Sequence, residues 1–212
     1  MKKWRCTICG YIHEGEQPPD VCPLCGAGPE AFELMEEGAA AEEPVAGTPV
    51  KKAAGLKGQA NTAVFKLTYG LFIVSSVKEG KLNGQACNTV IQVTTDPLQI
   101  VTGINKGNLT HEYIMDSGII GISILGQDGH DLVRRFGYKS GRELDKFAGI
   151  PYTLGVNGAP FPDGAIAYLE CRVNRERCID AGTHTLFVAE VVDGEVREDR
   201  DPMTYAYFRQ TK

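Results

Sequence analysis

The sequence predicts a mainly β protein made of two domains of unequal size, and three observations support this. Residues 1–36 are rich in Cys, Gly and Pro and show little periodic apolar pattern. Residues 37–58 change to Ala, Glu, Gly, Pro and Lys, a composition typical of a linker. From residue 59 to 212, many short apolar runs alternate with turn residues, which favours a closed or partly closed β-barrel over a doubly wound sheet.

Composition and charge exclude several classes of protein. The 212 residues are 42% hydrophobic, which is enough for a core, and their formal net charge of −5 argues against nucleic acid or an anionic membrane as partner. No run approaches the roughly 18 apolar residues of a membrane span. The basic start leads directly into a cysteine motif rather than an apolar signal segment, so we expect a cytoplasmic location.

The small domain contains a candidate metal site. Four of the seven cysteines lie in the first 25 residues, as two Cys-x-x-Cys pairs: Cys6, Cys9, Cys22 and Cys25. Two such pairs can form one tetrahedral four-thiolate site, and a metal would replace the core that so short a segment lacks. Zinc and iron both accept four thiolates, so the spacing alone leaves both metals open.

The sequence around these cysteines resembles a known module. Trp4 precedes the first pair, Gly10 and Gly26 each follow a second cysteine, and Phe32 is a candidate core aromatic. This pattern is similar to the rubredoxin-like domain at one end of rubrerythrins, including the short gap between the pairs. The resemblance implies one iron held by four thiolates, cycling between ferric and ferrous states. A structural zinc knuckle is the alternative.

For the larger domain, the residue pattern predicts strands, two helical stretches, a polar loop and a hairpin turn. The expected strands cover 71–77, 87–94, 99–105, 119–125, 165–174 and 183–192. A helix is expected over 109–116, with Asn108 as N-cap and Gly118 as its stop, and a second helical stretch over 131–147. We expect a polar loop over 83–89 and a tight hairpin turn over 192–195.

Residue chemistry alone gives a weak indication of a site in this domain. The polar loop and the helix start near 105–110 both suit a phosphate. The histidines His111, His130 and His184 are isolated in the sequence. We interpret the basic cluster of Arg134, Arg135, Lys139 and Arg142 as a solvated helix face, with phosphate binding as the alternative.

Several segments of this domain resemble the flavin reductase-like split-barrel family. They are 69–76, the stretch 83–97 that begins Asn-Gly and ends Asp-Pro, and the segments 105–110, 182–187 and 204–209. The resemblance covers nearly all of 59–212. It implies a split β-barrel with a few helices, FMN as cofactor, and a homodimer with FMN near the subunit interface.

The resemblance also implies roles for individual residues. Those expected to follow the ribityl chain and phosphate of FMN are Gln85, Ala86, Cys87, Asn88 and Thr89. Asn105, Lys106 and Thr110 would complete the phosphate site, with Lys106 as counter-charge. His184 would lie beside the isoalloxazine or the nicotinamide as the catalytic residue; the family often has Gly-Asp-His there, whereas this chain has Thr183 before the histidine.

The remaining three cysteines are not expected to take part in chemistry. Cys87 is interpreted as a small packing residue beside the flavin. Cys171 and Cys178 are interpreted as inert, because no base is paired with them in the sequence.

Together the two domains predict an electron-transfer enzyme. NAD(P)H gives two electrons as a hydride and a one-iron centre accepts one, and flavin chemistry joins the two. The combination resembles rubredoxin–flavin reductase fusions, which implies a protein acceptor such as a flavodiiron protein. The alternatives are a free flavin or ferric reductase with an accessory iron domain, and a non-enzymatic electron carrier reduced by another protein.

Overall fold

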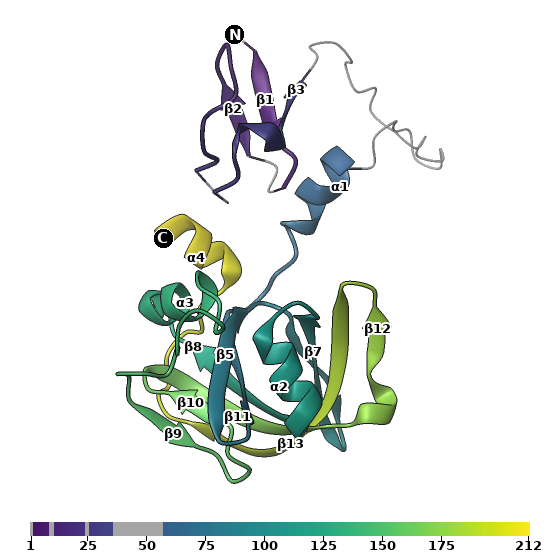
Figure 1. Ribbon diagram of the computed structural model, residues 1–212, viewed down its shortest axis with the longest axis vertical. Helices are drawn as coiled ribbons and strands as arrows, with labels where there is room; N and C mark the ends of the chain where they lie inside the picture. Colours follow the sequence, from purple (N-terminus) through teal and green to yellow (C-terminus); the bar gives the residue numbers. More distant parts are fainter. Residues whose placement is uncertain (1, 9–10, 24–25, 36–56) are drawn as a thin grey trace. The chain divides into compact units, whose positions relative to one another are not determined.

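A computed structural model describes residues 2–8, 11–23, 26–35 and 57–212 (Figure 1), without the side chains of residues 57–59 and 61. The chain divides into two compact units, Met1–Leu67 and Thr68–Lys212. Nearly all of the expected linker, and both Cys9 and Cys25, lie outside the described residues. Among the described helices, none has the length and apolar character to cross a membrane.

The first unit contains a three-stranded antiparallel sheet in the order β2-β1-β3. Its elements are β1 (Lys3–Cys6), β2 (Ile12–Glu14), the 3-10 helix η1 (Pro29–Ala31), β3 (Phe32–Met35) and α1 (Lys57–Val64). Among the described residues, its small core contains Cys6, Cys22, Ala31 and Phe32, so the prediction that Phe32 is a core aromatic is confirmed. Two of the four residues in this core are cysteines, which is consistent with a fold that depends on a metal.

The second unit is built on one large antiparallel sheet. Its strands, and those of a separate two-stranded sheet formed by β9 and β10, are β4 (Phe72–Lys78), β5 (Lys81–Cys87), β6 (Val90–Thr95), β7 (Leu98–Asn105), β8 (Ile119–Leu125), β9 (Tyr152–Leu154), β10 (Pro160–Pro162), β11 (Ala165–Val173), β12 (Ile179–Ala181) and β13 (His184–Val196). The order in the large sheet is β5-β4-β8-β11-β13-β7-β6, with β12 paired to β13.

The two ends of this strand order are consecutive in the sequence. Only Asn88 and Thr89 separate β5 from β6, so the sheet must curl until its first and last strands approach each other. The Thr89 carbonyl accepts a hydrogen bond from the Gly103 N–H at 3.2 Å, next to the curl. The expectation of a split, partly closed barrel is confirmed.

The helices of this unit pack on the curled sheet. They are α2 (Leu109–Ser117), α3 (His130–Gly137), η2 (Arg175–Arg177) and α4 (Tyr205–Thr211). Helix α2 contacts β4, β5 and β7, and α3 contacts β4 and β5. Figure 1 shows α3 beside α4, and the His130 Nε2 lies 2.7 Å from the Thr211 Oγ1. Strand β5 therefore lies where both α2 and α3 can face it.

The predicted and observed elements agree in segments that the sequence marks by regularly spaced apolar residues. The helix over 109–116 is confirmed, and Gly118 ends it with a φ of 70° in the left-handed region that glycine favours. Asn108 stands at the N-cap, but its side chain makes no cap bond and donates to Gln85 instead.

Three predictions were wrong. The expected polar loop over 83–89 is mostly strand β5. Its polar side chains are typical of a loop and gave no indication of a strand. The helical stretch over 131–147 ends at Gly137. The expected turn over 192–195 lies inside β13, which pairs with β11 around a bulge at Glu170 and Cys171.

Glu170 fixes the loop before β10. Its side chain is fully buried, and its carboxylate accepts hydrogen bonds from the backbone N–H groups of Asn157 and Ala159 at 2.9 and 3.0 Å. The Asn157 Nδ2 donates a further bond at 2.9 Å. Removing this acceptor would leave several donors in a buried place without a partner, and each costs free energy.

We predict that Glu170→Ala lowers the free energy of unfolding by about 2–4 kcal/mol. Urea unfolding followed by far-UV circular dichroism measures this, because the single tryptophan, Trp4, reports on the other unit. The matched control is Glu190→Ala, an exposed carboxylate on β13, which should change stability by less than about 0.5 kcal/mol. Equal effects of the two variants would contradict this role of Glu170.

Candidate functional site

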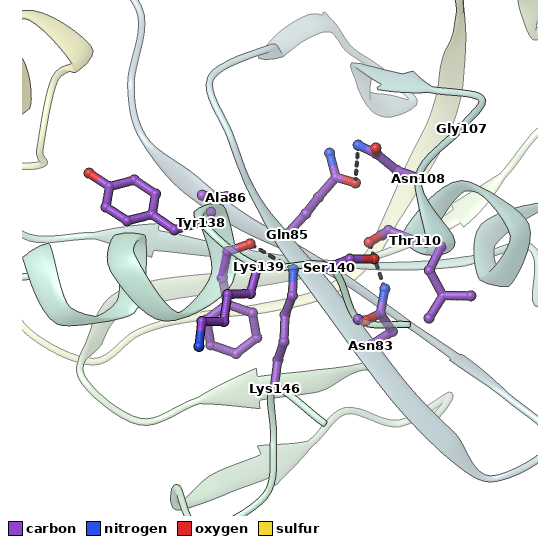
Figure 2. Close-up of a pocket in the computed structure, with 14 residues that line it drawn as sticks. Asn83, Gln85, Ala86, Gly107, Asn108, Thr110, Tyr138, Lys139, Ser140 and Lys146 are labelled. Carbon is purple, nitrogen blue, oxygen red and sulfur yellow. Dashed lines mark hydrogen bonds between the residues drawn. The ribbon is translucent and has the colours of Figure 1, made fainter. Parts of the chain in front are cut away.

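A polar cavity of about 300 Å³ lies between β5, the start of α2 and the segment that follows α3 (Figure 2). Its lining residues are Asn83, Gln85, Ala86, Gly107, Asn108, Leu109, Thr110, Phe136, Gly137, Tyr138, Lys139, Ser140, Gly141 and Lys146. The cavity exists because the curl of the sheet brings β5 against two helix ends. Its volume is at the small end of the range for ligand pockets.

Two hydrogen bonds tie β5 to the start of α2. The Asn83 Nδ2 donates to the Thr110 Oγ1 at 2.8 Å, and the Asn108 Nδ2 donates to the Gln85 Oε1 at 3.0 Å (Figure 2). These bonds fix the wall of the cavity at the N-terminus of α2. The partial positive charge of a helix N-terminus favours an anion there.

Lys146 brings a formal positive charge into the lining of the cavity. Its residue surface is only 4% exposed, and its ammonium donates to the carbonyl oxygens of Phe136 at 2.8 Å and Gly84 at 3.0 Å. Figure 2 shows its long side chain in the middle of the lining residues. Burial lowers the pKa of Lys146 to about 8, because the charged form loses hydration.

The segment between α3 and Lys146 completes the cavity. Lys139 and Ser140 line it, and Gly141 packs closely on Asn83. A Cβ on Gly141 would lie 2.0 Å from the Asn83 Oδ1, so a larger residue here would force the Asn83 side chain to move. Lys146 was not among the predicted site residues, because no local sequence pattern shows that its side chain turns inward.

The residues predicted to contact FMN fall into two groups. Gln85, Ala86 and Thr110 line the cavity. Cys87, Asn88 and Thr89 continue along and beyond the end of β5, with Cys87 buried 3.9 Å from the Thr102 Oγ1. Burial raises the pKa of the Cys87 thiol, which fits a packing role.

Asn105 and Lys106 lie just before α2, beside the cavity. The Asn105 Oδ1 accepts from the Gly107 N–H at 2.8 Å and so shapes the turn into the helix. Lys106 forms an ion pair with Asp180 at 2.7 Å. It would have to leave this pair to act as counter-charge to a phosphate.

His184 lies opposite Asn105 in the pairing of β13 with β7. Its Nδ1 is 2.9 Å from the Thr183 Oγ1, and its side chain is half-buried. A second histidine, His111 on α2, lies 2.9 Å from the Thr185 Oγ1, and burial lowers its pKa. Two imidazoles, one at the start of β13 and one on α2, therefore lie near this end of the sheet.

The basic cluster is not one uniform solvated face. Arg134 pairs with Asp131, and Arg142 pairs with Glu112. Arg135 donates to the carbonyl oxygens of Lys146 and Ala148 and thereby holds the segment after α3 in place. Lys139 lines the cavity and is the member of the cluster that the structure places there.

In the first unit, the structure describes two of the four predicted metal ligands. Cys6 and Cys22 are each 1% exposed, and their backbone N–H groups donate to Tyr11 and Ala27 at 2.8 and 2.7 Å. Gly26 donates to the Cys22 carbonyl with a φ of 75°, as the knuckle turn requires. Two cysteines buried together in so small a core fit a thiolate site, and Cys9 and Cys25 lie outside the described residues.

Comparison with known families gives the class of each unit. Residues 64–212 match the flavin reductase like domain, and residues 4–33 match the rubrerythrin, rubredoxin-like domain. The fold and the matches thus define an oxidoreductase of the NAD(P)H-dependent, flavin-binding class that carries a rubredoxin-like, iron-binding domain. The chain belongs to the flavin reductase-like family.

Individual relatives agree with this class. The chain is 47% identical over 152 residues to a "High molecular weight rubredoxin" of Moorella thermoacetica, covering 71% of this chain and 66% of that protein. It is 41% identical to a "Ferric-chelate reductase (NAD(P)H)" of Archaeoglobus fulgidus, covering 71% of this chain and 89% of that protein. The solved NADH:FAD oxidoreductase SgcE6 of Streptomyces globisporus shares the fold, with a TM-score of 0.65, 23% identity, and coverage of 76% and 95% of the two chains.

The buried Lys146 leads to a prediction about pH. Between pH 8 and 10.5, the ordinary lysine value, unfolded Lys146 holds a proton that folded Lys146 has released. Unfolding then takes up a proton, so the stability of the wild type relative to Lys146→Met should rise with pH across this window. The slope should reach up to about 1.4 kcal/mol per pH unit.

Urea unfolding at pH 7.5, 8.5 and 9.5 measures this difference. Lys81→Met, which removes an exposed lysine at the start of β5, is the matched control and should show no such slope. Parallel stability profiles of the wild type and Lys146→Met would show that burial does not shift the Lys146 pKa.

Proposed function

We propose that the chain passes electrons from NAD(P)H through FMN to an iron centre held by Cys6, Cys9, Cys22 and Cys25, and on to a protein acceptor such as a flavodiiron protein. One observation carries the proposal: a flavin reductase-like domain and a rubredoxin-like domain occur in the same chain. A bound flavin supplies the conversion of an electron pair into single electrons. The iron thiolate site takes them one at a time.

The polar cavity fits the phosphate and ribityl part of FMN. It offers hydroxyl and amide groups from β5 and α2, two lysines, and the N-terminus of α2. Gln85, Ala86 and Thr110 would bind this part of the cofactor, with Cys87, Asn88, Thr89, Asn105 and Lys106 around it. His184 would lie beside the flavin ring or the nicotinamide and hold it in position.

The first test is an anaerobic visible spectrum of the iron-supplied protein before and after NADH, and then NADPH. We expect ferric-thiolate and flavin bands in the resting protein, and we expect both to bleach with one of the two donors. A flavin that bleaches while the iron stays ferric would contradict transfer to the iron. Failure of both donors, with bleaching by a redox protein, would favour a carrier that does not use NAD(P)H.

A second candidate function is reduction of ferric chelates, with the iron domain accessory. It is favoured by the 41% identity to the ferric-chelate reductase, 89% of which is matched. Stopped-flow mixing with NAD(P)H distinguishes the two. Reduction of the iron centre faster than one catalytic turnover with a chelate supports the electron-transfer function, and slower reduction supports the chelate reductase.

We also propose that the chain is a homodimer with FMN near the interface. The cavity is small, which suits only part of a flavin and leaves the ring for another surface to cover. The edge of the sheet presents exposed apolar side chains on β6 and β7, namely Ile91, Val93 and Leu98. Contiguous exposed apolar surface commonly marks an interaction site.

We predict that Ile91→Glu with Val93→Glu converts the dimer to a monomer and lowers flavin content severalfold. Light scattering after size exclusion and the flavin absorbance per chain measure the two effects. Val156→Glu changes a side chain that is 75% exposed in the loop before β10, and it should alter neither. A wild-type monomer would disprove the dimer.

A further inference from the structure

A second cavity, of about 790 Å³, adjoins the polar cavity of Figure 2 and shares only Gly141 with its lining. It is formed by the start of β5, helix α2, the segment after α3 and the start of β9. Its volume lies within the range of small-molecule sites. None of the residues proposed to bind flavin or iron is among the described residues that line it, so the proposed electron transfer leaves this second cavity without a role.

The second cavity has an aromatic wall. Phe147 is buried, and the ring of Tyr152 packs edge-on against it, with the ring centroids 5.5 Å apart and the planes at 77°. Tyr152 is 41% exposed and Leu144, which also lines the cavity, is 39% exposed. A flat apolar ligand that covers these two side chains would remove their apolar surface from water, which is favourable.

Tyr113 of α2 contributes a polar group to this apolar wall. Its residue surface is only 9% exposed, and buried tyrosines ordinarily find a partner for their hydroxyl. The Tyr113 hydroxyl makes no hydrogen bond to a described residue and is not sealed inside the protein, so it opens onto the cavity that Tyr113 lines. Because a phenolic hydroxyl both donates and accepts, it can bind a hydroxyl or a carbonyl group of a ligand.

The charged side chains of the second cavity balance one another. Lys81 and Arg142 are positive, whereas Glu143 and Asp145 are negative. Arg142 is already engaged by an ion pair with Glu112 of α2. The described lining thus has no net formal charge, unlike that of the polar cavity, whose charged side chains are lysines. It does not compensate the cost of taking an ion out of water, and this favours a neutral ligand.

We propose that the second cavity binds a neutral, planar aromatic compound that carries a hydroxyl or a carbonyl group. The ring of the compound lies against Tyr152 and Leu144, and its polar group forms a hydrogen bond with the Tyr113 hydroxyl. This binding site goes beyond the electron-transfer function proposed above and does not depend on it, because the two cavities have one lining residue in common.

The experiment measures binding of 2-naphthol, which is neutral at pH 7, to the full-length, iron-loaded protein by equilibrium dialysis. We expect one site per chain in the wild type. Tyr152→Ala should lower the affinity about three- to tenfold, which is the effect of one pair of aromatic rings. Tyr152→Phe, which keeps the ring, should change it by less than about twofold.

Two comparisons test the chemistry of the ligand. Tyr113→Phe should lower the affinity for 2-naphthol about three- to tenfold, the effect of one hydrogen bond, and should leave naphthalene, which has no hydroxyl, within about twofold. The anion 2-naphthoate should bind the wild type more weakly than 2-naphthol does. Tighter binding of 2-naphthoate would overturn the assignment to a neutral ligand.

Leu154→Ala is the matched control, because Leu154 is an exposed apolar residue on the same strand, β9, and is not among the residues that line the second cavity. It should change the affinity for 2-naphthol by less than about twofold. Equal effects of Leu154→Ala and Tyr152→Ala would overturn the proposal, and so would a wild type that does not bind 2-naphthol.

A titration with FMN separates this site from the flavin site. Binding of 2-naphthol should persist at saturating FMN, and a loss that grows in proportion to the FMN concentration would overturn the proposal, since the probe would then occupy the flavin site. If NAD(P)H does not reduce the protein but 2-naphthol binds with the expected dependence on Tyr152, only the electron-transfer function fails. Should Tyr152→Ala lack the wild-type circular dichroism spectrum, Leu144→Asp decides: a fall of about threefold or more supports the site, and no fall overturns it.

Discussion

One interaction links the elements that line the cavity of the larger unit: the contact of the buried Lys146 ammonium with two carbonyl oxygens. One oxygen belongs to Gly84 on β5 and the other to Phe136 near the end of α3, so one side chain joins a strand to a helix. Because the sheet curls, β5 lies between the Lys146 contact and α2. The space that remains between the two helix ends is the cavity of Figure 2.

The two units belong to families whose redox chemistries differ in the number of electrons handled at a time. A flavin reductase-like domain handles electrons in pairs, whereas a single iron centre handles them singly. In the first unit, the protein contributes buried thiols and a tight turn at Gly26. In the second unit, it contributes a polar cavity with positive charge, and none of the described residues that line it is a carboxylate.

Much of the fold was predictable because apolar periodicity is a local property. The helix over 109–116 and its end at Gly118 follow from spacing and from one residue that accepts a positive φ. Strand β5 was not predicted, because its segment carries Asn83, Gly84 and Gln85 and looks like a loop. Tertiary pairing with β4 along its whole length overrides that local preference.

The candidate site was predictable only in part, for a similar reason. Family resemblance indicated Gln85, Ala86 and Thr110, which line the cavity. Lys146 could not be recognised, because its partners are backbone oxygens 62 and 10 residues away. Every residue has a backbone carbonyl, so the sequence does not show which of them a lysine will contact. Likewise, the pairing of Lys106 with Asp180 spans 74 residues. Long-range contacts decide which lysine faces the cavity.

The most direct measurement is a crystal structure of the protein with FMN bound. The account predicts phosphate density inside the cavity, within hydrogen-bonding distance of the Lys146 ammonium and close to Thr110 and Asn83. Phosphate density on the outer side of the α2 start, against Lys106 with its Asp180 pair broken, would contradict the central claim that this cavity is the flavin site.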